Sequence, residues 1–143
     1  MNKDLIFTRT AAFISDLHDL ESSLTNSTDK GALTPLQHNI LQILYFSNPK
    51  TLSALSECMN MNMPNTSREV KKLVLLELII KSPSPDDKRI VELTLTEAGQ
   101  QIIEYGLNKM KIEFFKNSGN WTEERTKKYL ESLTVLEQEL FGS

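Results

Sequence analysis

The sequence predicts a mostly helical chain that carries one small antiparallel β-hairpin after its fourth helix. Apolar residues recur at helical spacing through most of the chain. Two short runs read instead as strands, IIKS at 79–82 and RIVELTL at 89–95, and they flank the turn-forming segment PSPDDK. At 143 residues, with 39% hydrophobic and 24% charged content, the chain fits one globular domain.

Two helices and a short third are expected before residue 60. The first covers about residues 4–24 and carries apolar residues at broadly helical spacing: Leu5, Phe13, Leu17, Leu20 and Leu24. A polar loop follows at 25–32. Thr34 and Pro35 are typical of a helix start, and one face of this second helix is formed by Leu36, Ile40, Ile43 and Leu44. Asn48-Pro49 ends it, and Thr51 begins the short helix with Leu52, Leu55 and Met59.

The stretch MNMNMPNTSREVKKL, residues 59–73, begins with a strict alternation that is typical of a half-buried strand. A turn between two helices explains it better. Asn60 tolerates the left-handed conformation that a tight turn needs, and Met61 is expected to fill a corner of the core. Asn62 is a good N-cap, and Pro64 then lies in the first helical turn, where its missing N–H costs nothing.

The helix after this turn has two different faces. The inward face is expected to hold Thr66, Val70, Leu73 and Val74. The remaining positions are polar or basic with one leucine: Asn65, Ser67, Arg68, Lys71, Lys72 and Leu75. Such side chains near the start of a protruding helix can hydrogen-bond base edges in a DNA major groove. For an arbitrary helix, an ordinary solvated surface is the simpler interpretation.

Two further helices are expected after the hairpin. Thr96 caps a long helix that runs to about Asn117, with residues spaced for burial at Ile102, Ile103, Leu107, Met110 and Phe114. The segment NSGNW interrupts it. Thr122 then opens the last helix, whose apolar stripe is Tyr129, Leu133, Leu136 and Leu140.

Charge and cysteine content limit the possible partners and compartment. The net charge is −3, which argues against a nucleic-acid partner, although its distribution matters more than its sum. Between Pro64 and Arg89, six cations (Arg68, Lys71, Lys72, Lys81, Lys88 and Arg89) face four anions (Glu69, Glu77, Asp86 and Asp87), a local excess of 6 − 4 = +2. The single cysteine excludes an internal disulfide, and no signal peptide or membrane span is expected. A cytoplasmic location is the simplest interpretation.

Catalytic and metal-binding motifs are not found in the sequence. It contains no G-x-S-x-G, no phosphate-binding glycine loop and no metal motif, so we expect neither an enzyme nor a bound cofactor. The two histidines, His18 and His38, are not at metal-ligand spacing within one helix. Cys58, beside the turn, is expected to be a small buried thiol without a redox role.

Three segments of the sequence form a recognisable pattern: LTPLQHNIL at the second helix, TLSALSECMNMNMPNTSREVKKL from the short helix through the next one, and PSPDDKRIVELTLTEAG over the hairpin. With these three segments in this order, the sequence resembles the MarR family of winged helix-turn-helix transcriptional regulators, in which the hairpin is the wing. The most specific element is Asp87-Lys88-Arg89 followed by LTEAG at 95–99. The resemblance implies one MarR-like domain over 1–143, with the winged helix-turn-helix at about 33–99. The regions at about 1–25 and 100–143 would be dimerisation helices.

The resemblance also implies a function and a set of site residues. It implies a homodimeric repressor that binds a palindromic operator in double-stranded DNA and responds to a small-molecule effector. The DNA-binding residues would be Asn65, Ser67, Arg68, Lys71 and Lys72 in the recognition helix and Lys88 and Arg89 in the wing, with Asp87 supporting Arg89 by an ion pair. A winged-helix module that binds protein without binding DNA is the alternative.

Two positions depart from the family pattern. Relatives commonly carry glycine where Glu77 stands, so the recognition helix is expected to end without the usual left-handed glycine, and its end between 76 and 79 stays open. Asn60 also replaces a frequent glycine. That change is milder, because asparagine tolerates the same geometry.

Overall fold

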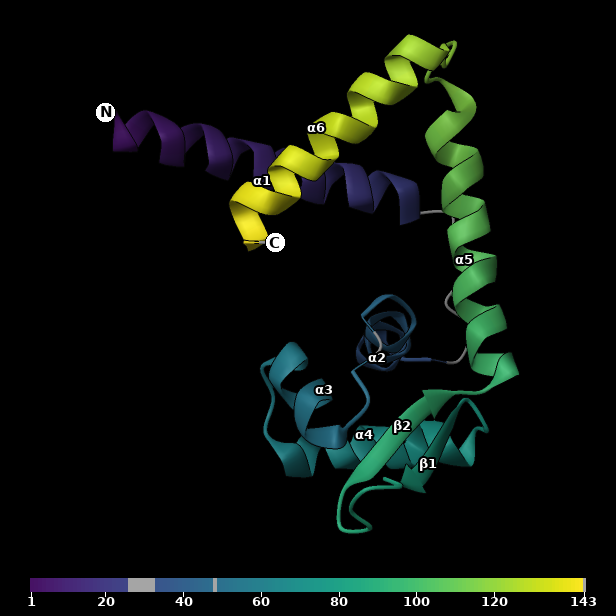
Figure 1. Ribbon diagram of the computed structural model, residues 1–143. Coiled ribbons are helices and arrows are strands. Elements are labelled where there is room, and N and C mark those ends of the chain that lie inside the picture. The colour runs from purple at the N-terminus through teal and green to yellow at the C-terminus, as the bar shows by residue number, and fades with distance from the viewer. Residues whose placement is uncertain (26–32, 48, 143) are drawn as a thin grey trace. The chain divides into compact units, whose positions relative to one another are not determined.

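The computed structural model describes residues 1–25, 33–47 and 49–142, and shows helices with one two-stranded antiparallel sheet in the predicted order (Figure 1). The elements are α1 (Lys3–Thr25), α2 (Pro35–Phe46), α3 (Leu52–Met59), α4 (Met63–Leu75), β1 (Ile79–Pro83), β2 (Val91–Leu95), α5 (Glu97–Lys116) and α6 (Glu123–Phe141). Within the described ranges, no helix combines the length and apolar character needed to cross a membrane.

The chain divides into two compact units, Met1–Met110 and a second unit that begins at Lys111. The first contains α2, α3, α4 and the hairpin around one apolar core. The buried members of this core come from all of these elements, from Leu78 between α4 and β1, and from α5: Ile40, Leu41, Leu44, Leu55, Val70, Leu73, Leu78, Ile79, Leu93 and Ile103. The fold is therefore the mostly helical, winged helix-turn-helix class that the sequence predicts.

The predicted helix starts are confirmed by hydrogen bonds between side chains and backbone. Thr34, Thr51, Asn62 and Thr122 each have extended backbone angles and accept a hydrogen bond from the N–H three residues later. Thr96 does the same for α5, because its Oγ1 accepts from the Gly99 N–H at 3.0 Å. Each such bond satisfies one of the N–H groups that a helix leaves unpaired.

The buried face of α2 differs from the predicted one by a rotation. Leu41 and the polar Gln37 are buried, whereas the predicted Leu36 and Ile43 are only half-buried. Leucine and isoleucine occupy so much of this helix that spacing alone left its inward direction ambiguous.

The hairpin pairs Ile79 with Leu95 and Pro83 with Val91. One further backbone contact extends it, because the Leu93 N–H donates to the Lys50 carbonyl at 2.7 Å beside a Thr51–Glu92 bridge. Lys50 and Thr51, just before α3, thus pair with β2 as a short third segment of the sheet. This pairing ties the hairpin to the start of the helix-turn-helix.

Helix α4 ends in a left-handed turn in which glutamate takes the place of glycine. Glu77 has φ 60°, its N–H donates to the Val74 carbonyl at 2.9 Å, and the Leu78 N–H donates to the Leu73 carbonyl at 3.0 Å. This pair of bonds usually has glycine at the left-handed position. The helix therefore lacks the glycine, as expected, but keeps the left-handed geometry.

We expect Glu77→Gly to raise the free energy of unfolding by about 1 kcal/mol, because a left-handed non-glycine residue costs about 1–2 kcal/mol and glycine's extra unfolded-state entropy offsets part of the gain. Urea unfolding of the purified protein measures the change. Glu77→Ala is the control, since it removes the charge but keeps the strained φ. Equal stabilisation by both variants would attribute the effect to charge and contradict the strain explanation.

The second unit has its own small aromatic cluster between the end of α5 and α6. The Trp121 ring lies 5.0 Å from the Tyr129 ring and 6.0 Å from the Phe115 ring, centroid to centroid. The Arg125 guanidinium stacks 4.0 Å from the Trp121 centroid and donates to the Ser118 carbonyl at 2.7 Å. These contacts stabilise the connection between α5 and α6, at the place where NSGNW was predicted to interrupt the helix.

Candidate nucleic-acid interface

The segment between α3 and α4 is the turn that was predicted for residues 59–63 in preference to a strand. Asn60 adopts φ 51° and ψ 43°, and the Met61 N–H donates to the Ser56 carbonyl at 3.0 Å. Asn62 then caps α4 by accepting from the Asn65 N–H at 2.8 Å. Met61 is half-buried and does not belong to the apolar core. The two helices form a helix-turn-helix, with α4 in the position of a recognition helix.

One face of α4 is completely buried and fixes the direction of the other. Thr66, Val70 and Leu73 have no exposed surface, and the Thr66 hydroxyl donates to the Asn62 carbonyl at 3.0 Å. Among the predicted outward residues, Ser67 is half-buried. The others are exposed: Asn65, Arg68, Lys71, Lys72 and Leu75. The packing of the inward face therefore fixes which side of α4 is directed toward solvent.

The three cations of α4 are not equivalent. Among the residues that the structure describes, Arg68 and Lys71 make no ion pair. Lys72 does, because its Nζ lies 3.2 Å from the Glu69 Oε1. Two guanidinium or ammonium groups are thus free to bind an external anion, and the third has an internal partner.

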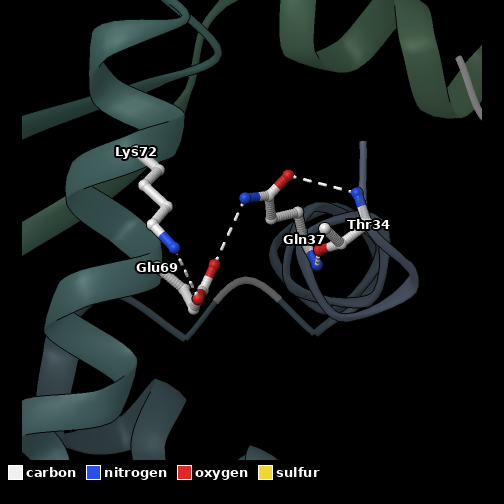
Figure 2. Close-up of polar contacts among 4 residues, drawn as sticks. All are labelled: Thr34, Gln37, Glu69 and Lys72. Atoms are coloured by element: carbon white, nitrogen blue, oxygen red, sulfur yellow. Dashed lines mark hydrogen bonds and ion pairs between the residues drawn. The ribbon is translucent and has the colours of Figure 1, made fainter. Parts of the chain in front are cut away.

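Glu69 is itself held from the neighbouring helix, as Figure 2 shows. The Gln37 Nε2 in α2 donates to the Glu69 Oε2 at 3.2 Å, and the Gln37 Oε1 accepts from the Thr34 N–H at 3.2 Å. A chain of contacts therefore runs from the start of α2 to Lys72. Gln37 was not among the residues predicted for the site, although the Thr-x-x-Gln pattern at 34–37 is the signature of a capping box.

The wing tip presents a braced arginine. The Arg89 Nε lies 3.1 Å from the Asp87 Oδ1 and its Nη2 lies 3.2 Å from the Asp87 Oδ2, while its backbone N–H also donates to Oδ1 at 3.0 Å. The guanidinium side chain is nevertheless 90% exposed. Fork-to-fork pairing of this kind fixes orientation, so Arg89 is held in one direction while it stays open to solvent. Lys88 beside it is also exposed.

The Asp87–Arg89 contact depends on pH in a defined direction. The Arg89 guanidinium, followed by the Arg89 backbone N–H, lowers the pKa of the Asp87 carboxyl below its usual value. A carboxyl with a lowered pKa contributes its stabilisation above its ordinary pKa. That contribution is lost as pH falls through the lowered value. Near neutral pH the Asp87–Arg89 contact, which we call the brace, is fully present.

The structure corrects the expectation about Cys58. Cys58 is exposed on α3, so the prediction of a buried thiol was wrong. It occupies a position on the solvent side of a helix whose buried residues are Leu55 and Ser56. Among the described residues, no group of three or more His, Cys, Asp or Glu side chains could hold a metal ion.

The comparisons with known proteins point in one direction. Residues 33–91, which contain the helix-turn-helix and most of the wing, match the model of the MarR family. The chain carries a MarR family domain. The solved structure of a MarR family protein from Bacillus stearothermophilus covers 98% of this chain and of its own, at TM-score 0.78 and 21% identity.

Two further relatives extend the comparison beyond the MarR domain. The uncharacterized HTH-type transcriptional regulator YpoP of Bacillus subtilis (strain 168) is 24% identical over 102 residues, which is 71% of this chain and 72% of YpoP. The structure of Streptococcus pneumoniae FabT in complex with DNA covers 97% of both chains at TM-score 0.61 and 18% identity. The fold thus extends over nearly the whole chain, and the MarR domain places it among transcriptional regulators.

Proposed function

We propose that this chain is a DNA-binding transcriptional repressor that acts in the cytoplasm as a homodimer on a palindromic operator. The observation that carries the proposal is the exposed cationic face of α4, which is rigidly opposed to a fully buried face. The DNA-bound structure of FabT, which has the same fold, supports it.

The α4 side chains have the chemistry for major-groove contacts. Asn65 can bond an adenine edge, and Arg68 can bond the two acceptors of guanine. Lys71 and Lys72 supply positive charge for phosphates. The Ser67 hydroxyl can bond either a base edge or a phosphate. Because α4 is anchored on its inner face, these groups enter a groove together and not one by one.

The wing supplies the second contact of the proposed interface. Arg89 and Lys88 lie at the tip of the hairpin, and a narrow minor groove attracts arginine through its enhanced negative potential. Asp87 holds the Arg89 guanidinium in its direction at the cost of one nearby negative charge. The brace favours a single arginine pose, which is what insertion into a groove requires.

The terminal helices support the homodimer. Among the described side chains, α1 and α6 have no buried residue, yet both carry many large apolar side chains. The exposed apolar residues of these two helices are Leu5, Ile6, Phe7, Phe13, Ile14, Leu17, Leu20, Tyr129, Leu130, Leu133, Val135, Leu136, Leu140 and Phe141. Exposed apolar surface on this scale is typical of an interface. We therefore assign 33–99 to DNA binding and the helices at 1–25 and 100–143 to dimerisation.

Release by a small molecule is the remaining part of the proposal. A hollow of about 360 Å³ lies between α1 and α2, within the size range of small-ligand sites. Its lining residues are Glu21, Pro35, Leu36, His38, Asn39 and Gln42. A ligand there would touch the first turn of α2. Helix α2 comes immediately before the helix-turn-helix in the chain.

One experiment tests DNA binding, symmetry and assembly together. Duplexes that the protein retains from a random-sequence DNA pool are sequenced, and the mass of the free protein is measured by sedimentation. We expect an inverted repeat with half-sites about one helical turn apart, affinity that falls steeply with salt, and a dimer. A winged-helix module that binds only protein would retain no duplex even at low salt.

A further inference from the structure

Gln37 uses both ends of its side-chain amide, although it lies in the core-facing surface of α2. It is only 8% exposed. Its oxygen completes the capping box of α2, and its nitrogen donates to Glu69 of α4 (Figure 2). The capping box needs only the oxygen, so the second bond has a separate consequence.

That consequence concerns the only acidic side chain of α4. Both carboxylate oxygens of Glu69 are occupied, one by Gln37 and one by Lys72, and the Glu69 side chain is 17% exposed against 54% for Lys72. The carboxylate is thus drawn back toward α2, while the ammonium beside it faces solvent. Without the bond from Gln37, a carboxylate next to Arg68 in the sequence and one turn before Lys72 would be free to swing to the helix surface.

We propose that Gln37 is a positioning residue for nucleic-acid binding: it retains the Glu69 carboxylate against α2 and so keeps negative charge away from the phosphate-facing side of α4. The inference rests on the proposed DNA-binding function. It deepens that function by naming a residue outside the interface that sets the charge of the interface.

Electrostatics gives the expected sign of each change. Non-specific affinity for DNA depends on the number of cations that reach phosphates, and a carboxylate among them repels the same phosphates. Releasing Glu69 from Gln37 therefore weakens binding. Neutralising Glu69 frees Lys72 and strengthens binding. The effect of releasing residue 69 disappears when that residue carries no charge.

Two substitutions isolate this effect. Gln37→Glu keeps the oxygen that caps α2 but replaces the donor to Glu69 with a second carboxylate. Glu69→Gln removes the charge, and the double variant Gln37→Glu/Glu69→Gln restores a donor–acceptor pair with the charge moved to α2. Gln101→Glu, at an exposed position of α5, is the matched control for the added charge, and sedimentation checks that it keeps the assembly state of the unmodified protein. Circular dichroism checks the fold, and Gln37→Met, which removes both the donor to Glu69 and the oxygen that caps α2 but adds no charge, replaces Gln37→Glu if that variant is unfolded.

The measurement is the affinity for a fluorescein-labelled random-sequence duplex, by anisotropy across a salt series. Relative to the control, we expect Gln37→Glu to weaken binding about twofold to fivefold and Glu69→Gln to strengthen it by a similar factor. When Glu69→Gln is already present, adding Gln37→Glu should have no effect beyond that of the control. Equal weakening by Gln37→Glu with and without Glu69→Gln, or no weakening at all, would overturn the role of Gln37 while leaving DNA binding intact. Absence of any duplex binding by the unmodified protein would overturn the proposed function and this inference with it.

Discussion

Gly99→Ala is expected to lower the free energy of unfolding by about 2 kcal/mol. A Cβ at residue 99 would overlap the carbonyl oxygen of Leu78 and lie 3.3 Å from a methyl carbon of Leu95. Overpacking of this kind costs about 1–3 kcal/mol or more, and the higher helix propensity of alanine returns at most about 1 kcal/mol. The steric term therefore outweighs the propensity term.

The Leu78 carbonyl is held in place by three hydrogen bonds around it and by the buried Leu78 side chain. It accepts from the Thr96 N–H at 3.1 Å, and the preceding Glu77 carbonyl accepts from the Thr96 hydroxyl at 2.7 Å. The Leu78 N–H is bonded to Leu73, and the Leu78 side chain is buried in the core. Shifting it would break the end of α4 and the cap of α5 together.

Urea unfolding measures the effect of Gly99→Ala, and Gln100→Ala is the control. Gln100 is the exposed neighbour of Gly99 in the same turn of α5, so its replacement is expected to change stability by no more than about 0.5 kcal/mol. A Gly99→Ala variant as stable as the control would show that the backbone at Leu78 is free to yield. The close approach of α5 to the end of α4 would then not be a rigid feature of this fold.

The parts of the fold that the sequence predicts well are those encoded within a few residues. The caps at Thr34, Thr51, Asn62, Thr96 and Thr122 are of this kind, because each hydroxyl or amide bonds an N–H only three residues away. The left-handed Asn60 is local in the same sense, since it depends on what asparagine tolerates.

The structural features that the sequence predicts poorly depend on contacts between residues that are distant in the sequence. Glu77 is left-handed because Leu78 must enter the core and the Glu77 carbonyl meets Thr96, which lies 19 residues later. The direction in which α2 faces, with Leu41 inward, is set by packing that no spacing in α2 shows. Cys58 was wrongly expected to be buried because cysteine usually is, although its helix turns it to solvent.

The candidate site shows the same division. The outward direction of Arg68 and Lys71 follows from helical spacing relative to the buried Val70 and Leu73, so it could be predicted. The retention of Glu69 by Gln37 could not be, because it joins residues 32 positions apart in sequence. Contacts that tune the charge of an interface are therefore easier to miss than the contacts that form it.

Arg68→Ala is expected to weaken binding to the selected operator by about 1–3 kcal/mol, the usual worth of a bidentate arginine–base contact. Arg68 is exposed, and no acidic side chain of the described residues pairs with it, so its guanidinium meets DNA without first breaking an internal contact. Fluorescence anisotropy with the selected duplex and with a scrambled duplex separates specific from non-specific loss. Lys111→Ala, outside the proposed DNA-binding face, is the control for removal of one positive charge, and sedimentation checks that it keeps the assembly state of the unmodified protein.

Arg68→Lys and Arg89→Ala then distinguish the two kinds of contact. Lysine keeps the charge but lacks the planar fork, so a base contact at residue 68 is lost in Arg68→Lys nearly as fully as in Arg68→Ala, whereas a phosphate contact is largely kept. Arg89→Ala should reduce affinity most where the sequence beside the half-site is A·T-rich, because narrow minor grooves attract arginine. If Arg68→Ala and Arg89→Ala both bind the operator as tightly as the control, α4 and the wing do not read DNA. The exposed cations of α4 would then need another anionic partner.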